Sequence, residues 1–251
     1  MKISGSKALV VGGASGMGRA TAALLRSKGA AVAIMDLHSK GGDVAEELGA
    51  KYYYCDVTDY EEVALAIAAI VEDLGGLGIA VNTAGGALPC RTIGKNGPHS
   101  LDEFRRTVEL NLIATFNLNR LQAWEMSKED GEDGERGVII NTASIAAFEG
   151  QIGQVAYTAA KAGIAGMSLT MARDLGRNGV RVLAIAPSLF ATGLTAGISE
   201  AMASALTAGA AFPQRMGIPD EFAHLAVAIV ENQMLNGTTI RLDGGQRFAA
   251  R

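Results

Sequence analysis

Short runs of apolar and β-branched residues alternate with longer helix-like stretches along the whole of this chain. Neighbouring parallel strands need a long connection between them, and in proteins that connection is usually a helix. The alternation therefore predicts an α/β fold, in which helices cover both faces of a doubly wound parallel sheet. About seven strands are expected, at residues 7–11, 32–36, 51–55, 79–82, 137–141, 180–185 and 238–242.

Alanine-rich segments of helical pattern lie between these strands, at residues 18–27, 61–74, 101–126, 157–175 and 220–230. Three other stretches are too long to be plain connectors, namely 91–100, 127–136 and 188–216. The charged, glycine-containing stretch 127–136 is predicted to be a solvated surface loop. The stretch 188–216 follows a strand end and is rich in small residues, which predicts a mobile substrate flap, with a plain helical excursion as the alternative.

The composition favours one globular domain over residues 1–251, because 49% of the residues are hydrophobic and only 19% are charged. A net charge of -4 makes nucleic acid a poor candidate partner. No apolar run is long enough for a membrane helix, and the first strand begins too early to leave room for a signal peptide. Cys55 and Cys90 fit neither a disulfide framework nor a metal pattern, so a reducing, cytoplasmic compartment is expected.

A glycine-rich turn joins the first expected strand to the first helix, and it contains Gly12, Ser15, Gly16, Met17 and Gly18. Glycines let the backbone approach a pyrophosphate closely, and the free amides of a helix N-terminus favour an anion. The spacing is Gly-x-x-x-Gly-x-Gly, so a purely structural turn is the alternative. The order of strand, turn and helix favours a Rossmann-type dinucleotide site.

Acidic residues end the second and third expected strands. At the position of Asp36, a carboxylate can accept hydrogen bonds from both ribose hydroxyls of an adenosine. Asp36 would repel a 2'-phosphate, and neither Gly13 nor Leu37 offers a basic side chain, so NAD is the expected cofactor. The alternative is that Asp36 caps the next turn. Asp56 and Val57 could hold the adenine in the same way, although Asp56 could equally be a turn residue.

The strongest chemical signal is Tyr157 followed four residues later by Lys161, because this spacing puts both side chains on one face of a helix. A free tyrosine has a pKa of about 10, and a nearby ammonium lowers that pKa so that the phenol can exchange a proton with an alcohol. Such a pair alone is usually structural. Ser144, at the end of the fifth strand, adds a hydroxyl that can polarise a carbonyl oxygen from the other side.

These three residues, the run Asn82-Thr83-Ala84-Gly85 and the mid-helix Asn111 together resemble the short-chain dehydrogenase/reductase family along essentially the whole chain. The resemblance implies a catalytic set of Asn111, Ser144, Tyr157 and Lys161, in which Asn111 anchors a water in a proton relay. It also implies a homotetramer built through the long helices and the C-terminal segment. Cofactor contacts are implied for Asn82, Ala84, Gly85, Tyr157, Lys161, Pro187, Phe190 and Thr192.

Further runs resemble the type II 3-hydroxyacyl-CoA dehydrogenase branch of this family, at residues 137–144, 147–151, 185–190, 222–225 and 240–244. This branch also acts on hydroxysteroids and branched acyl-CoA intermediates. The resemblance implies a 3-hydroxyacyl-CoA substrate, with Gln154 lining the substrate pocket beside Ser144 and Tyr157. Other alcohol or hydroxysteroid dehydrogenases and 3-oxoacyl reductases are alternatives on the same scaffold, and a non-catalytic NAD-binding scaffold subunit is an alternative of another class.

Three residues depart from the family pattern: Val11 where threonine is usual, Thr83 where alanine or cysteine is usual, and Ser188 where glycine is common. The first two affect hydrogen bonds of the cofactor loop, and the third affects a turn beside the nicotinamide. His38, His99 and His224 are each isolated from other ligand-type residues in the sequence, so we expect no metal site.

Overall fold

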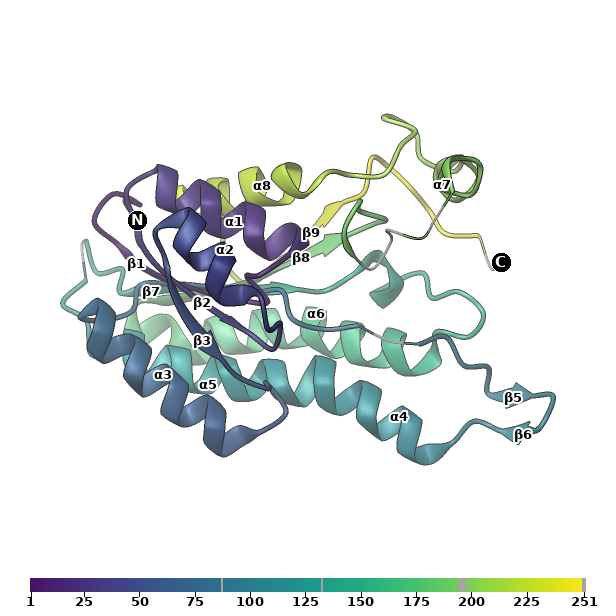
Figure 1. The fold of residues 1–251 in the computed structure, drawn as a ribbon, viewed down its shortest axis with the longest axis horizontal. Helices are drawn as coiled ribbons and strands as arrows, with labels where there is room; N and C mark the ends of the chain where they lie inside the picture. The colour runs from purple at the N-terminus through teal and green to yellow at the C-terminus, as the bar shows by residue number, and fades with distance from the viewer. Residues whose placement is uncertain (87, 132, 194–196, 198, 250–251) are drawn as a thin grey trace.

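A computed structural model describes residues 1–86, 88–131, 133–193, 197 and 199–249. Seven strands form one parallel sheet in the order β3-β2-β1-β4-β7-β8-β9, which confirms the predicted α/β fold (Figure 1). The strands are β1 (Lys7–Val11), β2 (Ala31–Asp36), β3 (Lys51–Tyr54), β4 (Ile79–Asn82), β7 (Gly137–Thr142), β8 (Val180–Pro187) and β9 (Thr239–Leu242).

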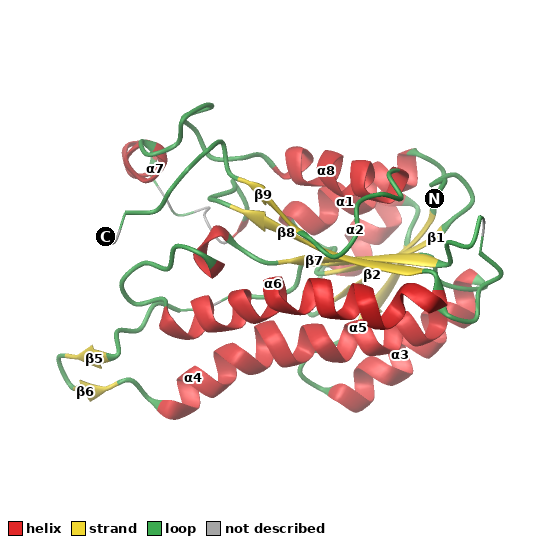
Figure 2. Ribbon diagram, turned by 180° about the vertical axis from the view of Figure 1, so that it is seen from behind, coloured by secondary structure: helices red, strands yellow, loops and turns green. Residues whose placement is uncertain are grey.

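Helices cover both faces of this sheet (Figures 1 and 2). One face carries α1 (Gly16–Ser27), α2 (Gly41–Leu48) and α8 (Pro219–Glu231), and the other carries α3 (Tyr60–Leu74), α4 (Leu101–Val108), α5 (Ala114–Met126) and α6 (Val155–Leu175). Successive side chains of a strand point to opposite faces, so Val10 of β1 joins the apolar layer beneath α1 and α8, while Leu9 and Val11 join the layer beneath α3 and α5. The central strands are buried on both sides, which explains their continuous apolar sequence.

Two helical regions differ from the prediction. Helix α2 lies in a stretch where no element was expected, because it starts with two glycines, which have low helix propensity. The segment 101–126 was predicted as one helix, but a π-helical turn (Glu109–Ile113) separates α4 from α5. Such turns are rare inside α-helices and are often found at functional sites.

The predicted loops contain more structure than expected. Residues 91–100 hold a short antiparallel hairpin of β5 (Ile93–Gly94) and β6 (Gly97–Pro98). The predicted flap 188–216 includes the helix α7 (Glu200–Thr207), so the alternative of a helical excursion describes this part of it; residues 194–196 and 198 lie outside the described residues. Short 3₁₀ turns occupy Ile145–Ala147 and Gly176–Asn178.

The predicted surface loop 127–136 is exposed over most of its described residues, but Glu135 is buried. Its Oε1 accepts a hydrogen bond of 2.7 Å from Nε of the buried Arg181. The expectation of a wholly solvated segment is therefore wrong at its end, because an opposite charge from β8 draws this carboxylate inward.

The strand order changes direction between β1 and β4, since β1 leads outward to β2 and β3 while β4 leads to β7, β8 and β9. The loops that leave these two strands pass to opposite faces of the sheet and leave a crevice at the carboxyl ends of the strands. Among the residues that the structure describes, no helix is both long and apolar enough to cross a membrane.

Candidate active site

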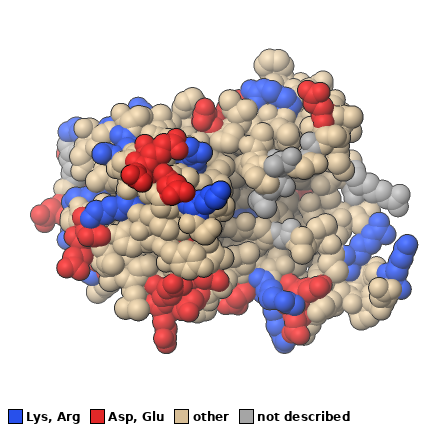
Figure 3. Space-filling view, viewed as in Figure 1, with Lys and Arg blue, Asp and Glu red and all other residues tan. Residues whose placement is uncertain are grey.

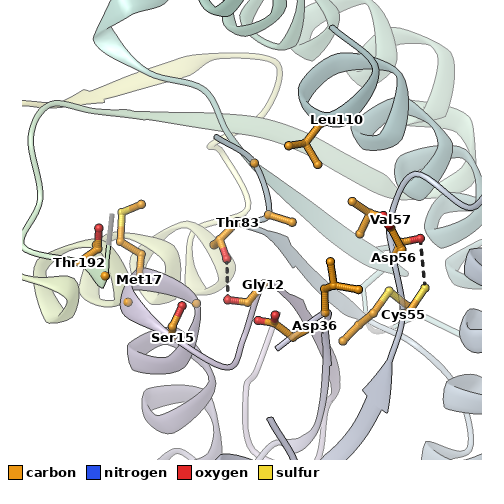
Figure 4. A pocket seen from close by; sticks show the side chains of 17 residues that line it. Gly12, Ser15, Met17, Asp36, Cys55, Asp56, Val57, Thr83, Leu110 and Thr192 are labelled. Carbon is orange, nitrogen blue, oxygen red and sulfur yellow. Dashed lines mark hydrogen bonds between the residues drawn. The ribbon is translucent and has the colours of Figure 1, made fainter. Parts of the chain in front are cut away.

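A cavity of about 340 Å³ opens at the carboxyl ends of β1 to β4, at the point where the strand order changes direction (Figure 4). Most of the predicted cofactor residues line it: Gly12, Ser15, Gly16, Met17, Gly18, Asp36, Asp56, Val57, Ala84, Gly85 and Thr192. They come from five separate segments of the chain and meet only because the parallel sheet brings its strand ends to one edge.

The glycine turn has room for a dinucleotide because its glycines carry no side chains that would fill the space. A Cβ built on Gly18 would lie 2.1 Å from the carbonyl oxygen of Gly12 and 2.6 Å from Oγ1 of Thr83, so only glycine leaves the turn intact. Gly12 also has a positive φ of 76°, which favours glycine. Helix α1 begins at Gly16, so its free amides face the same space, where they can bind a pyrophosphate.

Two departures from the family pattern meet in this turn. The hydroxyl of Thr83 donates a hydrogen bond of 2.8 Å to the carbonyl oxygen of Val11. It also donates a longer one, of 3.2 Å, to the carbonyl oxygen of Gly12 (Figure 4). A threonine from β4 therefore fixes the backbone of the turn after β1. The predicted effect of Thr83 on the hydrogen bonds of the cofactor loop is visible in these contacts, whereas Val11 contributes only its backbone carbonyl oxygen.

The Asp36 carboxylate faces the cavity from the end of β2 (Figure 4). Its Oδ2 accepts the backbone N–H of Ala14 at 2.9 Å, and its Oδ1 accepts that of His38 at 2.9 Å. A carboxylate oxygen accepts more than one hydrogen bond, so both retain capacity for ribose hydroxyls. The described residues that line the cavity include no lysine or arginine.

Tyr157, Lys161 and Ser144 lie together beyond this cavity. The ammonium nitrogen of Lys161 is 5.5 Å from the centre of the Tyr157 ring, and it donates a hydrogen bond of 2.8 Å to the carbonyl oxygen of Thr142. Ser144 and Tyr157 are hydrogen-bonded through their side chains. The cavity-lining Gly85 connects this group to the cofactor site, since a Cβ built there would lie 3.3 Å from the Lys161 nitrogen.

Burial sets the pKa values of this group. It raises the pKa of Tyr157 above its usual value, while the hydrogen bond from Ser144 acts in the opposite direction. Burial also lowers the pKa of Lys161 to about 8. The expectation that the ammonium lowers the tyrosine pKa is not met here, because the loss of hydration around the phenol outweighs the favourable contacts.

Asn111 is fully buried in the π-helical turn. Its Nδ2 donates to the carbonyl oxygen of Gly86 at 2.7 Å, and its Oδ1 accepts the Gly86 N–H at 3.1 Å. The side chain thereby holds the loop after β4. Its backbone carbonyl accepts the hydroxyl of Thr115 at 2.6 Å, which ties the π-helical turn to the start of α5.

Four predicted contacts lie elsewhere. Asn82 is buried beneath the site, where its Nδ2 bonds to the side-chain oxygens of Asn119, Gln122 and Asn141. Phe190 packs in the core under α8, with its ring against Gly217. Pro187 ends the buried strand β8 outside the cavity lining, and Gln154 bonds to Gln151 in the loop before α6. Packing thus takes the side chains of Asn82 and Phe190 away from the cofactor cavity, while the place of Gln154 in the substrate pocket stays a prediction.

Sequence reasoning did not place Met35, Leu37, Cys55, Thr83, Leu110 and Gly193 in the cavity lining. Five of them adjoin predicted site residues at the ends of β2, β3 and β4 and after Thr192, a proximity that could have indicated them. Leu110 carried no such signal, because only the packing of the π-helical turn against the sheet brings it to the cavity (Figure 4).

The expectation that His99 is isolated from other ligand-type residues is wrong. The ligand-type atoms of Cys90, His99 and Glu103 all lie within 4.8 Å of one another. They come from the loop after β4, the end of the β5–β6 hairpin and the first turn of α4. The hairpin folds back and brings Cys90 close to His99 and Glu103, which are only four residues apart in the sequence.

The model of the short chain dehydrogenase family matches residues 6–203 of this chain. The chain belongs to the short chain dehydrogenase family. It is 47% identical to a 3-hydroxyacyl-CoA dehydrogenase type-2 of Drosophila melanogaster, over 98% of this chain and 99% of that one. It is 46% identical to the Homo sapiens protein of the same name, over 98% and 97% of the two chains.

Two solved structures of short chain dehydrogenases superimpose closely on this one. A 3-hydroxyacyl-CoA dehydrogenase type-2 from Mycobacterium avium has a TM-score of 0.94 at 41% identity, covering 98% of both chains. A 7 alpha-hydroxysteroid dehydrogenase, solved with NADH and 7-oxo glycochenodeoxycholic acid, has a TM-score of 0.88 at 28% identity, covering 100% of this chain and 97% of that one. The chain is therefore an oxidoreductase that uses a nicotinamide dinucleotide, as the resemblance implied.

Proposed function

We propose that this short chain dehydrogenase uses NAD to interconvert 3-hydroxyacyl-CoA and 3-oxoacyl-CoA in lipid metabolism, with Tyr157 as the proton-transfer residue. The observation that carries the reaction type is the meeting of Tyr157, Ser144 and Lys161 beside the dinucleotide cavity. The names of relatives with 46–47% identity over almost the whole chain support the substrate.

The dinucleotide, when bound, supplies or accepts the hydride. In oxidation, the Tyr157 oxygen takes the proton of the substrate hydroxyl, and the Ser144 hydroxyl donates a hydrogen bond to the oxygen that becomes the carbonyl. The charge of Lys161, 5.5 Å from the Tyr157 ring, favours the phenolate, although burial keeps the pKa of Tyr157 raised in the protein without substrate. The bond of Lys161 to the Thr142 carbonyl fixes the position of its ammonium group. In reduction, Tyr157 returns the proton.

A second cleft of about 440 Å³ supports a bulky substrate. Its lining includes Thr158, which follows Tyr157 directly, and Arg91, which is exposed at the base of the β5–β6 hairpin. Lys95 adds another exposed cation at the tip of that hairpin, and Figure 3 shows Lys and Arg side chains at this edge of the molecule. Cations here would attract the phosphates of coenzyme A.

The substrate is tested by measuring NADH formation with a 3-hydroxyacyl-CoA, beside a panel of hydroxysteroids and simple secondary alcohols. We expect kcat/KM to be highest for the acyl-CoA. Activity on the other alcohols alone would refute the acyl-CoA assignment and leave the dehydrogenase assignment standing.

Asp36→Ala tests the proposed preference for NAD. Loss of hydrogen bonds from the ribose to a carboxylate is expected to weaken NAD binding by about 10- to 100-fold, since such a bond is worth about 1.5–3 kcal/mol. NADP binding should not weaken, because the repulsion of its 2'-phosphate is removed as well. Both dissociation constants are measured by fluorescence titration, with the exposed Asp43→Ala as the matched control. An unchanged NAD affinity in Asp36→Ala would contradict the assignment.

We also propose a cytoplasmic homotetramer. The apolar side chains of Phe116 and Trp124 on α5 and Leu169 on α6 are about half exposed, at 47%, 62% and 48%, as expected for surfaces that pack between subunits. Cys55 and Cys90 are free thiols, which suits a reducing compartment. Sedimentation equilibrium measures the subunit number, and a monomer at micromolar concentration would refute the tetramer.

A further inference from the structure

Cys90, His99 and Glu103 form a group of metal-ligand side chains outside the candidate active site. We propose that these three side chains bind one Zn²⁺ ion and that the ion fastens the β5–β6 hairpin to α4 beside the second cleft. The proposal does not depend on the identity of the substrate.

The donor set is the first reason to assign zinc. A thiolate, an imidazole nitrogen and a carboxylate oxygen are the ligand types that zinc prefers, and three protein ligands with one open position are common at sites that keep a water. Calcium and magnesium favour oxygen ligands alone. The thiol of Cys90 would release its proton on binding.

The distances are the second reason. Metal–ligand bonds of about 2.0–2.3 Å place tetrahedral ligand atoms roughly 3.5 Å apart. The three ligand-type atoms already lie within 4.8 Å of one another. Rotation of an exposed side chain can close the remaining difference, and Glu103 is exposed on the first turn of α4.

The surroundings hold His99 in place. Its backbone N–H donates to the carbonyl oxygen of Thr92 at 2.9 Å across the hairpin, and its ring meets the edge of Phe104 at a centroid distance of 6.2 Å. Its Nδ1 is buried and has no hydrogen-bond partner among the described residues. Buried polar nitrogens normally have a partner, so this nitrogen is available to bind a metal ion or to accept a hydrogen bond.

The position of Cys90 links the site to the second cleft. Its thiol is partly exposed, and Cys90 itself lines that cleft. Its backbone N–H donates to the carbonyl oxygen of Gly153 at 2.8 Å, four residues before Tyr157. An ion held by Cys90, His99 and Glu103 would therefore restrain the hairpin at the wall of the cleft.

The test uses the whole protein, freed of metal by dialysis against a chelator that is then removed. Titration with Zn²⁺ in a calorimeter should give one ion per chain. We expect Cys90→Ser, His99→Gln and the conservative, exposed Glu103→Gln each to weaken this binding by more than about 10-fold. His224→Gln changes an exposed histidine on α8, serves as the matched control, and should bind as the wild type does.

Two further measurements decide the site. Co²⁺ in place of Zn²⁺ should give a thiolate-to-metal charge-transfer band in the wild type that Cys90→Ser lacks. Zn²⁺ should slow amide hydrogen exchange in residues 91–99 of the wild type but not of Cys90→Ser. Equal Zn²⁺ affinity of the wild type and Cys90→Ser, or a Co²⁺ spectrum without the thiolate band, would overturn the proposal.

Discussion

Tyr157→Phe is expected to lower turnover by about 10²- to 10⁴-fold, the usual contribution of a positioned acid or base, while dinucleotide binding is retained. The substitution removes one oxygen and keeps the ring that Lys161 overlies. Tyr157 is not among the residues that line the dinucleotide cavity, so the cofactor loses no packing contact there. The loss should therefore appear in kcat and not in the dissociation constant of NADH.

Initial rates with the best alcohol of the substrate panel measure the effect, and fluorescence titration measures NADH binding. Tyr54→Phe removes the same atom from an exposed residue of β3 and should leave kcat unchanged. A Tyr157→Phe enzyme with wild-type turnover would refute the role of this phenol. A cellular phenotype that survives Tyr157→Phe would favour the alternative of a non-catalytic scaffold subunit.

Arg181→Met should lower the free energy of unfolding by about 3–5 kcal/mol, as expected when one partner of a buried ion pair is removed. Arg181 is buried in β8 and bonds to Glu135, while its other nitrogens donate to carbonyl oxygens of Ile229, Val230, Asn232 and Leu235. These carbonyls lie at and beyond the end of α8, where helix carbonyls lack partners within the helix. Methionine at this position removes the cation that pairs with Glu135, and it removes the N–H groups that donate to the carbonyl oxygens at the end of α8.

Urea unfolding of the protein measures this loss. The control is Arg105→Met, because Arg105 and Asp102 form an exposed pair on α4, and such pairs contribute less than about 1 kcal/mol. Equal losses of unfolding free energy in the two variants would show that burial of the Arg181 pair does not add to its contribution to stability.

The same pair predicts a pH dependence. Burial would raise the pKa of Glu135, but hydrogen bonds from the Met1 amino group and from Arg181 outweigh it, so the pKa lies below 4.5. A lowered pKa adds stability above the unfolded value, and that stability is lost as the pH falls through the folded value. Stability of the wild type should therefore decrease below about pH 4.5, and more steeply than that of Arg181→Met. Parallel curves would contradict this.

Local sequence patterns predicted much of the fold and of the candidate site. Six of the expected strands end within one residue of the observed ones, because short apolar runs bounded by turn residues are recognisable from composition alone. Only the strand ending at Pro187 continues further, by two residues, which pair with β9. The spacing of Tyr157 and Lys161 was also sufficient, since residues four apart on a helix share a face wherever the helix lies.

Other features could not be predicted because they depend on partners distant in the sequence. Asn82 looked like a cofactor contact beside Ala84 and Gly85, but amides from α5 and β7 bind its side chain in the core. Asn111 stood inside a helical pattern, and nothing in that pattern reveals the change from α to π hydrogen bonding at Glu109–Ile113. Both outcomes follow from packing against the sheet, and local propensity is a weak guide there.

The sequence by itself determined the parallel sheet, the glycine turn and the pairing of Tyr157 with Lys161, because each follows from the periodicity or chemistry of one short segment. Only the tertiary structure decided that the side chain of Phe190 packs in the core and that Cys90, His99 and Glu103 meet beside a hairpin. The physical reason is that side chains choose among available partners by burial and by hydrogen bonding. Those partners become neighbours only when the chain has folded.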